Sequence, residues 1–179
     1  MCMKLLDILK EVIDEEIRKK EKLNKRGAFK SVYDFESKPG YVLKTWNDGT
    51  PLVKKEYEVF EKHPDLFANI IKVNWDRKWI AQEKLDSDRA YKELSDLSDD
   101  LDMTAFDLSG HLESLVSEPD TLYNDYNLLS TVNPSNIPVY KKWVDFYKKI
   151  DKIDIGGYKD LNPGNFGYDK SGHLKLLDI

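Results

Sequence analysis

The sequence YKDLNPGN at residues 158–165, together with the aspartate that follows it, decides the fold class of this chain. Asp160 and Asn165 lie five positions apart on a Pro-Gly loop, and Asp178 follows Asn165 by thirteen positions, after the apolar run at residues 174–177. A carboxylate on such a loop orients a hydroxyl nucleophile, while an amide oxygen and a second carboxylate are hard ligands that hold Mg²⁺ against phosphates. The spacing therefore indicates a site for magnesium and a triphosphate.

Composition places the chain among globular proteins and bounds its environment. Apolar residues make up 40% of its 179 residues and aromatic residues 12%, which is enough to build a core. Cys2 is the single cysteine, so neither a disulfide framework nor a cysteine-based metal site is expected. No stretch reads as a signal peptide or reaches membrane-spanning length, and the net charge of −5 argues against nonspecific nucleic-acid binding. We expect a cytoplasmic protein that binds neither membranes nor nucleic acids.

Residues 86–125 concentrate the acidic side chains of the chain. Twelve aspartate and glutamate residues in this segment are opposed only by Arg89 and Lys92. The segment therefore carries a charge of about −10, and the remainder of the chain about +5. Two interpretations are open: the acids form a solvated helical face, or they bind a basic partner or substrate.

The spacing of apolar residues predicts a chain that mixes strands and helices. Short apolar runs bounded by turn residues predict five strands, at residues 22–29, 31–35, 41–46, 70–75 and 79–85. Apolar residues at helical spacing predict three helices, at residues 3–20, 51–62 and 138–153. The segment at residues 86–136 reads as a mixture of helix and loop.

The order of several polar residues along these elements resembles the protein-kinase-like superfamily. Lys44 ends a YVLK strand, Glu56 lies on the next helix, and the loop with Asp160, Asn165 and Asp178 comes last, as in that superfamily. The loop is closest to those of aminoglycoside and choline kinases and of eukaryotic-like protein kinases. The resemblance implies an α+β, protein-kinase-like fold with a five-stranded antiparallel N-lobe and an abbreviated helical C-lobe that ends at the metal-binding aspartate. It implies the boundaries 1–21 for an N-terminal helix, 22–85 for the N-lobe and 86–179 for the truncated C-lobe.

The resemblance assigns a role to each catalytic residue. It makes Asp160 the base that orients the acceptor hydroxyl, and Asn165 and Asp178 the magnesium ligands. It implies that Lys44 binds the α- and β-phosphates of ATP. Glu56 is the expected partner of this lysine, with Glu58 as the alternative.

The resemblance also implies a nucleotide pocket built from the strands. Gln82 is expected at the back of the adenine pocket, with backbone groups of Glu83 and Leu85 at the adenine edge. The nucleotide-binding residues implied in this way are Gly27, Ala28, Phe29, Lys30, Val32, Lys44, Gln82, Glu83 and Leu85. The loop at residues 27–32 departs from the family pattern because it keeps a single glycine. Tyr158 and Lys159 replace the usual histidine and arginine before the catalytic aspartate.

Two functions from different classes follow from these observations. The first is an ATP- and magnesium-dependent phosphotransferase that moves the γ-phosphate to a hydroxyl acceptor, either a protein serine or threonine or a small molecule. The second is a catalytically weak or inactive pseudokinase-like module that regulates a partner protein, such as a bacteriophage product acting on a host protein. The degenerate glycine loop and the absence of a substrate lobe after residue 178 motivate this second function.

A final expectation concerns the apolar face of the helix at residues 138–153. Trp143, Tyr147, Ile150 and Phe166 would form an exposed apolar patch unless another segment covers them. We expect residues 86–136 to supply that cover, and the N-terminal helix or a second subunit in a homodimer are the alternatives. The covering segment carries apolar residues at roughly helical spacing, namely Leu94, Leu97, Leu101, Phe106, Leu108, Leu112, Leu115 and Val116.

Overall fold

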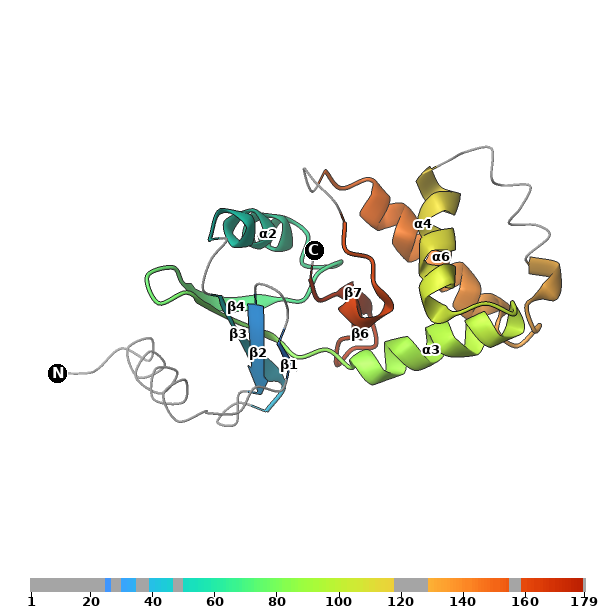
Figure 1. Cartoon of the computed structure of the whole chain (residues 1–179), viewed down its shortest axis with the longest axis horizontal. Helices are drawn as coiled ribbons and strands as arrows, with labels where there is room; N and C mark the ends of the chain where they lie inside the picture. The colour runs from blue at the N-terminus through green and yellow to red at the C-terminus, as the bar shows by residue number, and fades with distance from the viewer. Residues whose placement is uncertain are drawn as a thin grey trace. The chain divides into compact units, whose positions relative to one another are not determined.

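The structure, a computed structural model, describes residues 25–26, 30–34, 39–46, 50–117, 129–154 and 159–178 (Figure 1). The predicted helix at residues 3–20 lies outside these described residues, as does the segment 27–29 with Gly27, Ala28 and Phe29. The chain divides into two compact units, one formed by Met1–Thr50 and Ile71–Gln82 and the other by Pro51–Ile70 and Glu83–Ile179. The described part of the first unit is a sheet, and the second unit is mainly helical.

The first unit is built on a five-stranded sheet in the order β1-β2-β3-β5-β4. Its strands are β1 (Lys25–Arg26), β2 (Lys30–Asp34), β3 (Tyr41–Trp46), β4 (Ile70–Asn74) and β5 (Trp79–Glu83). β2 runs antiparallel to both β1 and β3, with Val32 opposite Lys44. The turn before β3 uses Gly40 at a φ of 97°, a left-handed conformation that glycine adopts without a steric penalty. The prediction of an α+β chain with an antiparallel sheet is confirmed.

Aromatic residues hold this sheet together. Leu43, Trp79 and Ala81 form its buried cluster, and Tyr33 and Tyr41 pack against them. The β4–β5 turn is joined to the end of β3, because the Trp46 amide donates a hydrogen bond of 3.2 Å to the carbonyl of Lys78. β3 and β5 carry continuous apolar runs, at Tyr41–Leu43 and Trp79–Ala81, and most of their residues are buried, as expected for two adjacent strands in the interior of the sheet.

The second unit contains four described helices and a short hairpin. They are α2 (Thr50–Lys62), α3 (Ser87–Asp100), α4 (Ala105–Ser117) and α6 (Ile137–Asp151), the 3-10 turn η2 (Pro163–Asn165), and the antiparallel strands β6 (Phe166–Tyr168) and β7 (Leu174–Leu176). α3 begins where the Asp86 carboxylate accepts a hydrogen bond from the Arg89 amide, which satisfies one unpaired N–H of the first turn. This cap explains why β5 ends at Glu83, two residues before the predicted end of the strand.

The core of the second unit is one apolar cluster between α3, α4, α6 and the hairpin, which lie together in Figure 1. Phe166 of β6 stands edge-on to Trp143, with ring centroids 5.1 Å apart and an interplanar angle of 87°. Leucines of α3 and α4 complete the cluster, and each fully buried side chain of this kind contributes about 1.5–3 kcal/mol of burial free energy. The covering leucines are Leu94, Leu97, Leu108, Leu112 and Leu115.

The expectation that residues 86–136 cover the helix at 138–153 is therefore confirmed, with one correction. Trp143, Tyr147 and Ile150 are all buried by the described residues. Phe106, which we expected to join the cover, is 65% exposed because it lies in the first turn of α4 on the side away from the core.

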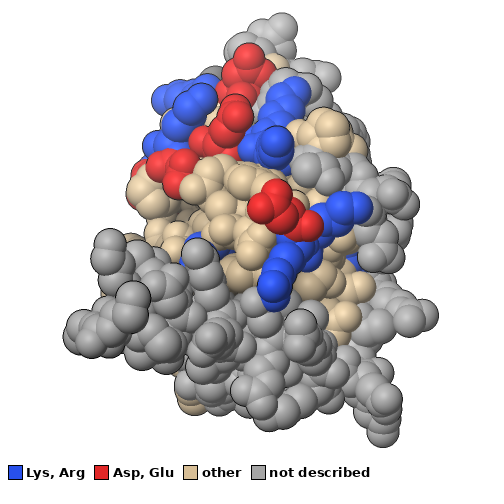
Figure 2. Space-filling model, turned by 90° about the vertical axis from the view of Figure 1, so that its left-hand side faces the viewer, with Lys and Arg blue, Asp and Glu red and all other residues tan. Residues whose placement is uncertain are grey.

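None of the helices in the described ranges is long and apolar enough to cross a membrane. On the face shown in Figure 2, lysine and arginine side chains alternate with aspartate and glutamate over the described part of the surface. Among the residues coloured in that view, charges of the two signs are therefore interspersed.

Candidate functional site

The loop at residues 159–165 owes its shape to Asn162. Its side-chain oxygen accepts a hydrogen bond of 3.1 Å from the Gly164 amide, and its carbonyl accepts one of 2.8 Å from the Asn165 amide. Pro163 occupies the first position of the turn, where its fixed φ suits the conformation and no amide proton is required. The Asn-Pro-Gly-Asn sequence thus specifies a capped turn whose last residue is Asn165.

Two further hydrogen bonds bring the predicted catalytic residues together. The Asn165 side-chain amide donates to the Asp160 carbonyl at 3.0 Å. The Leu177 amide donates to the Asn165 carbonyl at 2.6 Å, which places the residue before Asp178 against the loop. These bonds bring the backbones of Asp160, Asn165 and Leu177 together at the end of the hairpin where β6 starts and β7 finishes. Asp178 follows Leu177 directly, and we call Asp160, Asn165 and Asp178 the loop triad.

The loop triad has the chemistry of a magnesium site. Because the NH₂ group of Asn165 is bonded to Asp160, its side-chain oxygen is directed away from that bond and is the group left to ligate. The Asp178 carboxylate adds a second hard oxygen donor. No group of three or more His, Cys, Asp and Glu residues that could enclose a metal occurs among the described residues. Two protein ligands nevertheless suit Mg²⁺, which normally completes its coordination with water and substrate phosphates.

Lys159 fixes the start of the loop. Its ammonium group donates to the carbonyls of Ile150 and Asp151 at 3.0 and 3.1 Å, and it lies 3.6 Å from the Asp151 carboxylate. A cation at this place also offsets the negative end of the helix dipole of α6. Lys159 therefore attaches the loop to the end of α6 directly before the exposed Asp160.

Lys44 and Glu56 are both buried side chains. Lys44 lies on β3 and is 5% exposed, and Glu56 lies on α2 and is 6% exposed. Glu58, the alternative partner, is exposed. The burial of Glu56 favours it over Glu58 as the inward-facing glutamate, and the pairing with Lys44 stays a prediction.

The described residues that we predicted to bind the nucleotide lie on β2, β3 and β5 and just after β5. Lys30 and Val32 are half-buried on β2, and Gln82 is buried on β5. The Glu83 amide donates to the Asn69 carbonyl at 2.9 Å, and the Leu85 carbonyl accepts from the Ser87 amide at 3.1 Å. The Leu85 amide has no hydrogen-bond partner within the described ranges, so it is the backbone group left for a ligand.

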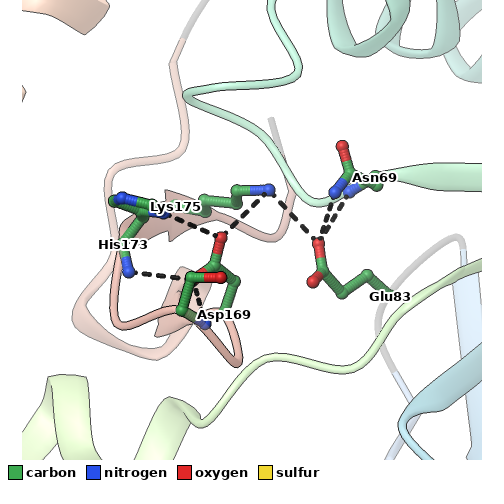
Figure 3. A network of polar contacts seen from close by, with 6 residues as sticks. Asn69, Glu83, Asp169, His173 and Lys175 are labelled. Carbon is green, nitrogen blue, oxygen red and sulfur yellow. Dashed lines mark hydrogen bonds and ion pairs between the residues drawn. The ribbon is translucent and has the colours of Figure 1, made fainter.

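A buried ion-pair network, which the sequence reasoning missed, links β7 to the end of β5 (Figure 3). The Lys175 ammonium lies 3.3 Å from Glu83 and 3.5 Å from Asp169, and Lys175 is only 4% exposed. The Glu83 carboxylate also accepts a hydrogen bond of 2.9 Å from the Asn69 side chain. These contacts tie the strand that precedes Asp178 to the segment that carries Glu83.

Asp169 closes this network at the turn of the hairpin. Burial alone would raise its pKa, but the backbone N–H groups of His173 and Ser171 and the charge of Lys175 hold the pKa below its usual range. Both amides donate to the Asp169 carboxylate at 2.9 Å. The Asp-Lys-Ser-Gly-His sequence is the signal that could have identified this turn, because an aspartate is typically bonded to amides two or more residues ahead.

A second unpredicted cluster lies where α3 and α6 meet β6. The hydroxyl of Tyr168 donates to the Glu93 carboxylate, and the Lys142 ammonium contacts both groups. Burial, followed by the hydrogen bond to Glu93, raises the pKa of Tyr168, so its hydroxyl keeps its proton. The Arg89 guanidinium lies over the Tyr168 ring, 4.1 Å from its centroid. This cluster anchors the hairpin that carries the loop triad.

Gly167 is required by the close approach of two backbones. Tyr168 and Asp86 form a β-bridge, and a Cβ at position 167 would lie 2.5 Å from the Leu85 Cβ. Glycine within a strand often marks such an approach, and this is the signal that the sequence offered. The hairpin therefore sets the position of Leu85 directly.

A groove of about 900 Å³ lies on another side of the second unit, between α6 and the turn of the hairpin. Leu66, Phe146 and Leu174 are among the residues that line it. No member of the loop triad lines this groove, so it is separate from the candidate site.

Comparisons with known proteins give a weak structural likeness. No protein-family model matches the chain, and no curated protein sequence matches it. Choline kinase LicA from Streptococcus pneumoniae is similar at 16% identity and a TM-score of 0.39, over 96% of this chain and 68% of that chain. The ternary complex of APH(2")-IIa with streptomycin and ATP is similar at 13% identity and a TM-score of 0.38, over 99% of this chain and 74% of that chain. Because both TM-scores are low, we infer function from this chain's own residues.

Proposed function

We propose that the chain is an ATP- and Mg²⁺-dependent phosphotransferase of the protein-kinase-like class, which transfers the γ-phosphate to a hydroxyl group of a small molecule or a protein. The observation that carries this proposal is the closure of the loop triad. The bond from Asn165 to the Asp160 carbonyl and the bond from Leu177 to the Asn165 carbonyl bring the backbones of Asp160, Asn165 and the residue before Asp178 together, which supports a shared task for their side chains. Phosphoryl transfer depends mainly on such positioning of charged groups.

Each residue of the loop triad has a distinct task in this proposal. The exposed Asp160 carboxylate accepts the hydrogen bond of the acceptor hydroxyl and orients its oxygen toward the γ-phosphate. The Asn165 side-chain oxygen and the Asp178 carboxylate hold the magnesium ion. When bound, Mg²⁺ supplies positive charge that offsets the charge developing on the phosphate oxygens.

The remaining predicted residues bind the nucleotide. Lys44 contacts the α- and β-phosphates, and Glu56 holds the lysine in a charged, oriented state. The Leu85 amide binds the edge of the adenine, which agrees with its lack of a partner among the described residues. Lys30, Val32 and Gln82 line the pocket around the nucleotide.

The proposal is tested by phosphate transfer from γ-labelled ATP in the presence of Mg²⁺, with water, a panel of hydroxyl compounds and mixed proteins as acceptors. We expect Asp160→Ala and Asp178→Ala to lower the transfer rate at least about 100-fold, because each removes a positioned acidic group. Asp99→Ala is the matched control, since Asp99 is an exposed aspartate on α3 outside the loop. Transfer by both loop variants at the rate of the unaltered protein would refute the proposal.

A further inference from the structure

A buried serine on α4 is bonded to the loop that carries Asp160. Ser109 is 3% exposed, and its hydroxyl donates a short hydrogen bond to the carbonyl of Leu161, the residue after Asp160. The same hydroxyl is bonded to the hydroxyl of Tyr147 on α6. Ser109 thus connects two helices of the core to the loop through a single oxygen atom.

The direction of these bonds follows from the chemistry of the groups. The Leu161 carbonyl can only accept, so the Ser109 hydroxyl uses its one proton there. The Tyr147 hydroxyl must then donate to the Ser109 oxygen. Burial raises the pKa of Tyr147 well above its ordinary value, so its proton is retained at working pH. A directed chain of two bonds therefore runs from α6 through α4 to the loop.

These two hydrogen bonds hold the loop at Leu161, the residue directly after Asp160. Lys159, on one side, is bonded to the end of α6, and Leu161, on the other, is bonded to Ser109. The Asp160 side chain is exposed and receives no hydrogen bond from another described residue. Its position therefore depends on the bonds that hold its backbone, which are those of its two neighbours and the bond from Asn165 to its own carbonyl.

We propose that Ser109, supported by Tyr147, is a positioning residue that sets the orientation of the Asp160 carboxylate. The expected effect on kcat rests on the proposed phosphotransferase function, whereas the expected effect on the order of the loop does not. An error of about 1 Å in the position of a reacting group lowers a rate by up to about 100-fold. α4 would thus have two roles, as the cover of the core and as the support of the catalytic loop.

Ser98 offers a matched control for a purely structural role. It is also a buried serine, 3% exposed on α3, and its hydroxyl donates at 2.8 Å to the Ser95 carbonyl of its own helix. Ser98→Ala and Ser109→Ala each remove one buried serine hydroxyl, but only the second removes a bond to the loop. Tyr147→Phe removes the hydrogen bond to Ser109 and keeps the aromatic ring, and Ser109→Thr keeps the hydroxyl group at position 109.

The kinetic arm compares kcat and KM for MgATP in these variants. We expect Ser109→Ala to lower kcat roughly 10- to 100-fold with KM within about twofold of the unaltered protein. Tyr147→Phe should lower kcat less, Ser109→Thr should restore part of the loss, and Ser98→Ala should leave kcat unchanged. Equal kcat values in Ser109→Ala and Ser98→Ala would overturn the proposal. Tyr147→Phe provides the same comparison if Ser109→Ala does not fold.

A second arm is independent of activity. Hydrogen exchange of the Gly164 and Asn165 amides, which are bonded within the loop, reports on its order. We expect exchange there to become faster in Ser109→Ala and Tyr147→Phe but not in Ser98→Ala. If exchange becomes faster in these two variants while the unaltered protein transfers no phosphate, the phosphotransferase proposal fails but the positioning role of Ser109 stands. Unchanged exchange in both variants would overturn the positioning role even if transfer is observed.

Discussion

At the scale of single residues, Lys175 shows how a charge is kept inside this protein. Its ammonium group forms ion pairs with two carboxylates, Glu83 and Asp169. The Glu83 carboxylate also accepts a hydrogen bond from the Asn69 side chain, and the Asp169 carboxylate accepts hydrogen bonds from backbone amides of the turn. A buried charge without such partners would cost several kcal/mol, so the members of the network depend on one another. The sequence alone could not reveal this network, because its members come from three separate segments.

Asp169 gives this network a pH dependence. Because its folded-state pKa lies below the ordinary 3.8, the stabilisation it provides is present above that value and is lost as the pH falls through the folded-state pKa. We expect Asp169→Asn to lower stability at pH 7 and to flatten the fall in unfolding free energy as the pH decreases below about 4. Urea unfolding at several pH values measures both effects. Asp99→Asn should change neither, and an unaltered slope in Asp169→Asn would contradict the assignment.

At the scale of elements, the β6–β7 hairpin is the part that organises the site. It carries Asn165 and Asp178 at one end, holds Asp169 and Lys175 in its body, and packs Phe166 into the core. It also bridges to Asp86 through Tyr168, which brings it against Leu85. One short element thereby links the loop triad to the segment proposed to bind adenine.

Two glycines of the second unit are expected to respond in opposite ways to alanine. A Cβ at Gly167 would lie 2.5 Å from the Leu85 Cβ, so Gly167→Ala should destabilise by about 1–3 kcal/mol through overpacking. A Cβ at Gly110 on α4 meets no atom within 4 Å, so Gly110→Ala should stabilise by about 0.5–1 kcal/mol through helix propensity. Chemical denaturation of the two variants measures both changes. Two shifts of the same sign would contradict the packing described around Leu85.

The elements also show how far sequence reasoning reached. The five strands of the first sheet were predicted from short apolar runs between turn residues, and α2 and α6 from apolar residues at helical spacing. The Asn-Pro-Gly-Asn turn was predicted because its residues specify the backbone locally. The segment at residues 86–136 was predicted only as a cover, since its two described helices, α3 and α4, lie in one acidic stretch with few boundary signals. The hydrogen bonds of Ser109 could not be predicted from the sequence, because its partners are 38 and 52 residues away along the chain.

At the scale of the whole molecule, the loop triad and the nucleotide-binding residues come from distant parts of the chain. Asp160, Asn165 and Asp178 belong to the second unit, whereas Lys44 lies on β3 of the first. The proposed function assigns roles in nucleotide binding to residues of both units. A ligand that binds only the folded protein raises the free energy of unfolding by an amount set by its concentration and affinity.

Binding of MgATP is therefore the measurement that tests the central claim most directly. Thermal unfolding is compared without ligand, with ATP alone and with ATP plus Mg²⁺, for the unaltered protein, Asp178→Asn and Asp99→Asn. At about 100 times the dissociation constant, MgATP should stabilise the unaltered protein by about 2.7 kcal/mol, a rise in Tm of roughly 5–10 °C. We predict that the Mg²⁺-dependent part of this rise persists in Asp99→Asn and is lost in Asp178→Asn. An unaltered protein whose Tm does not respond to MgATP at any concentration would contradict the account.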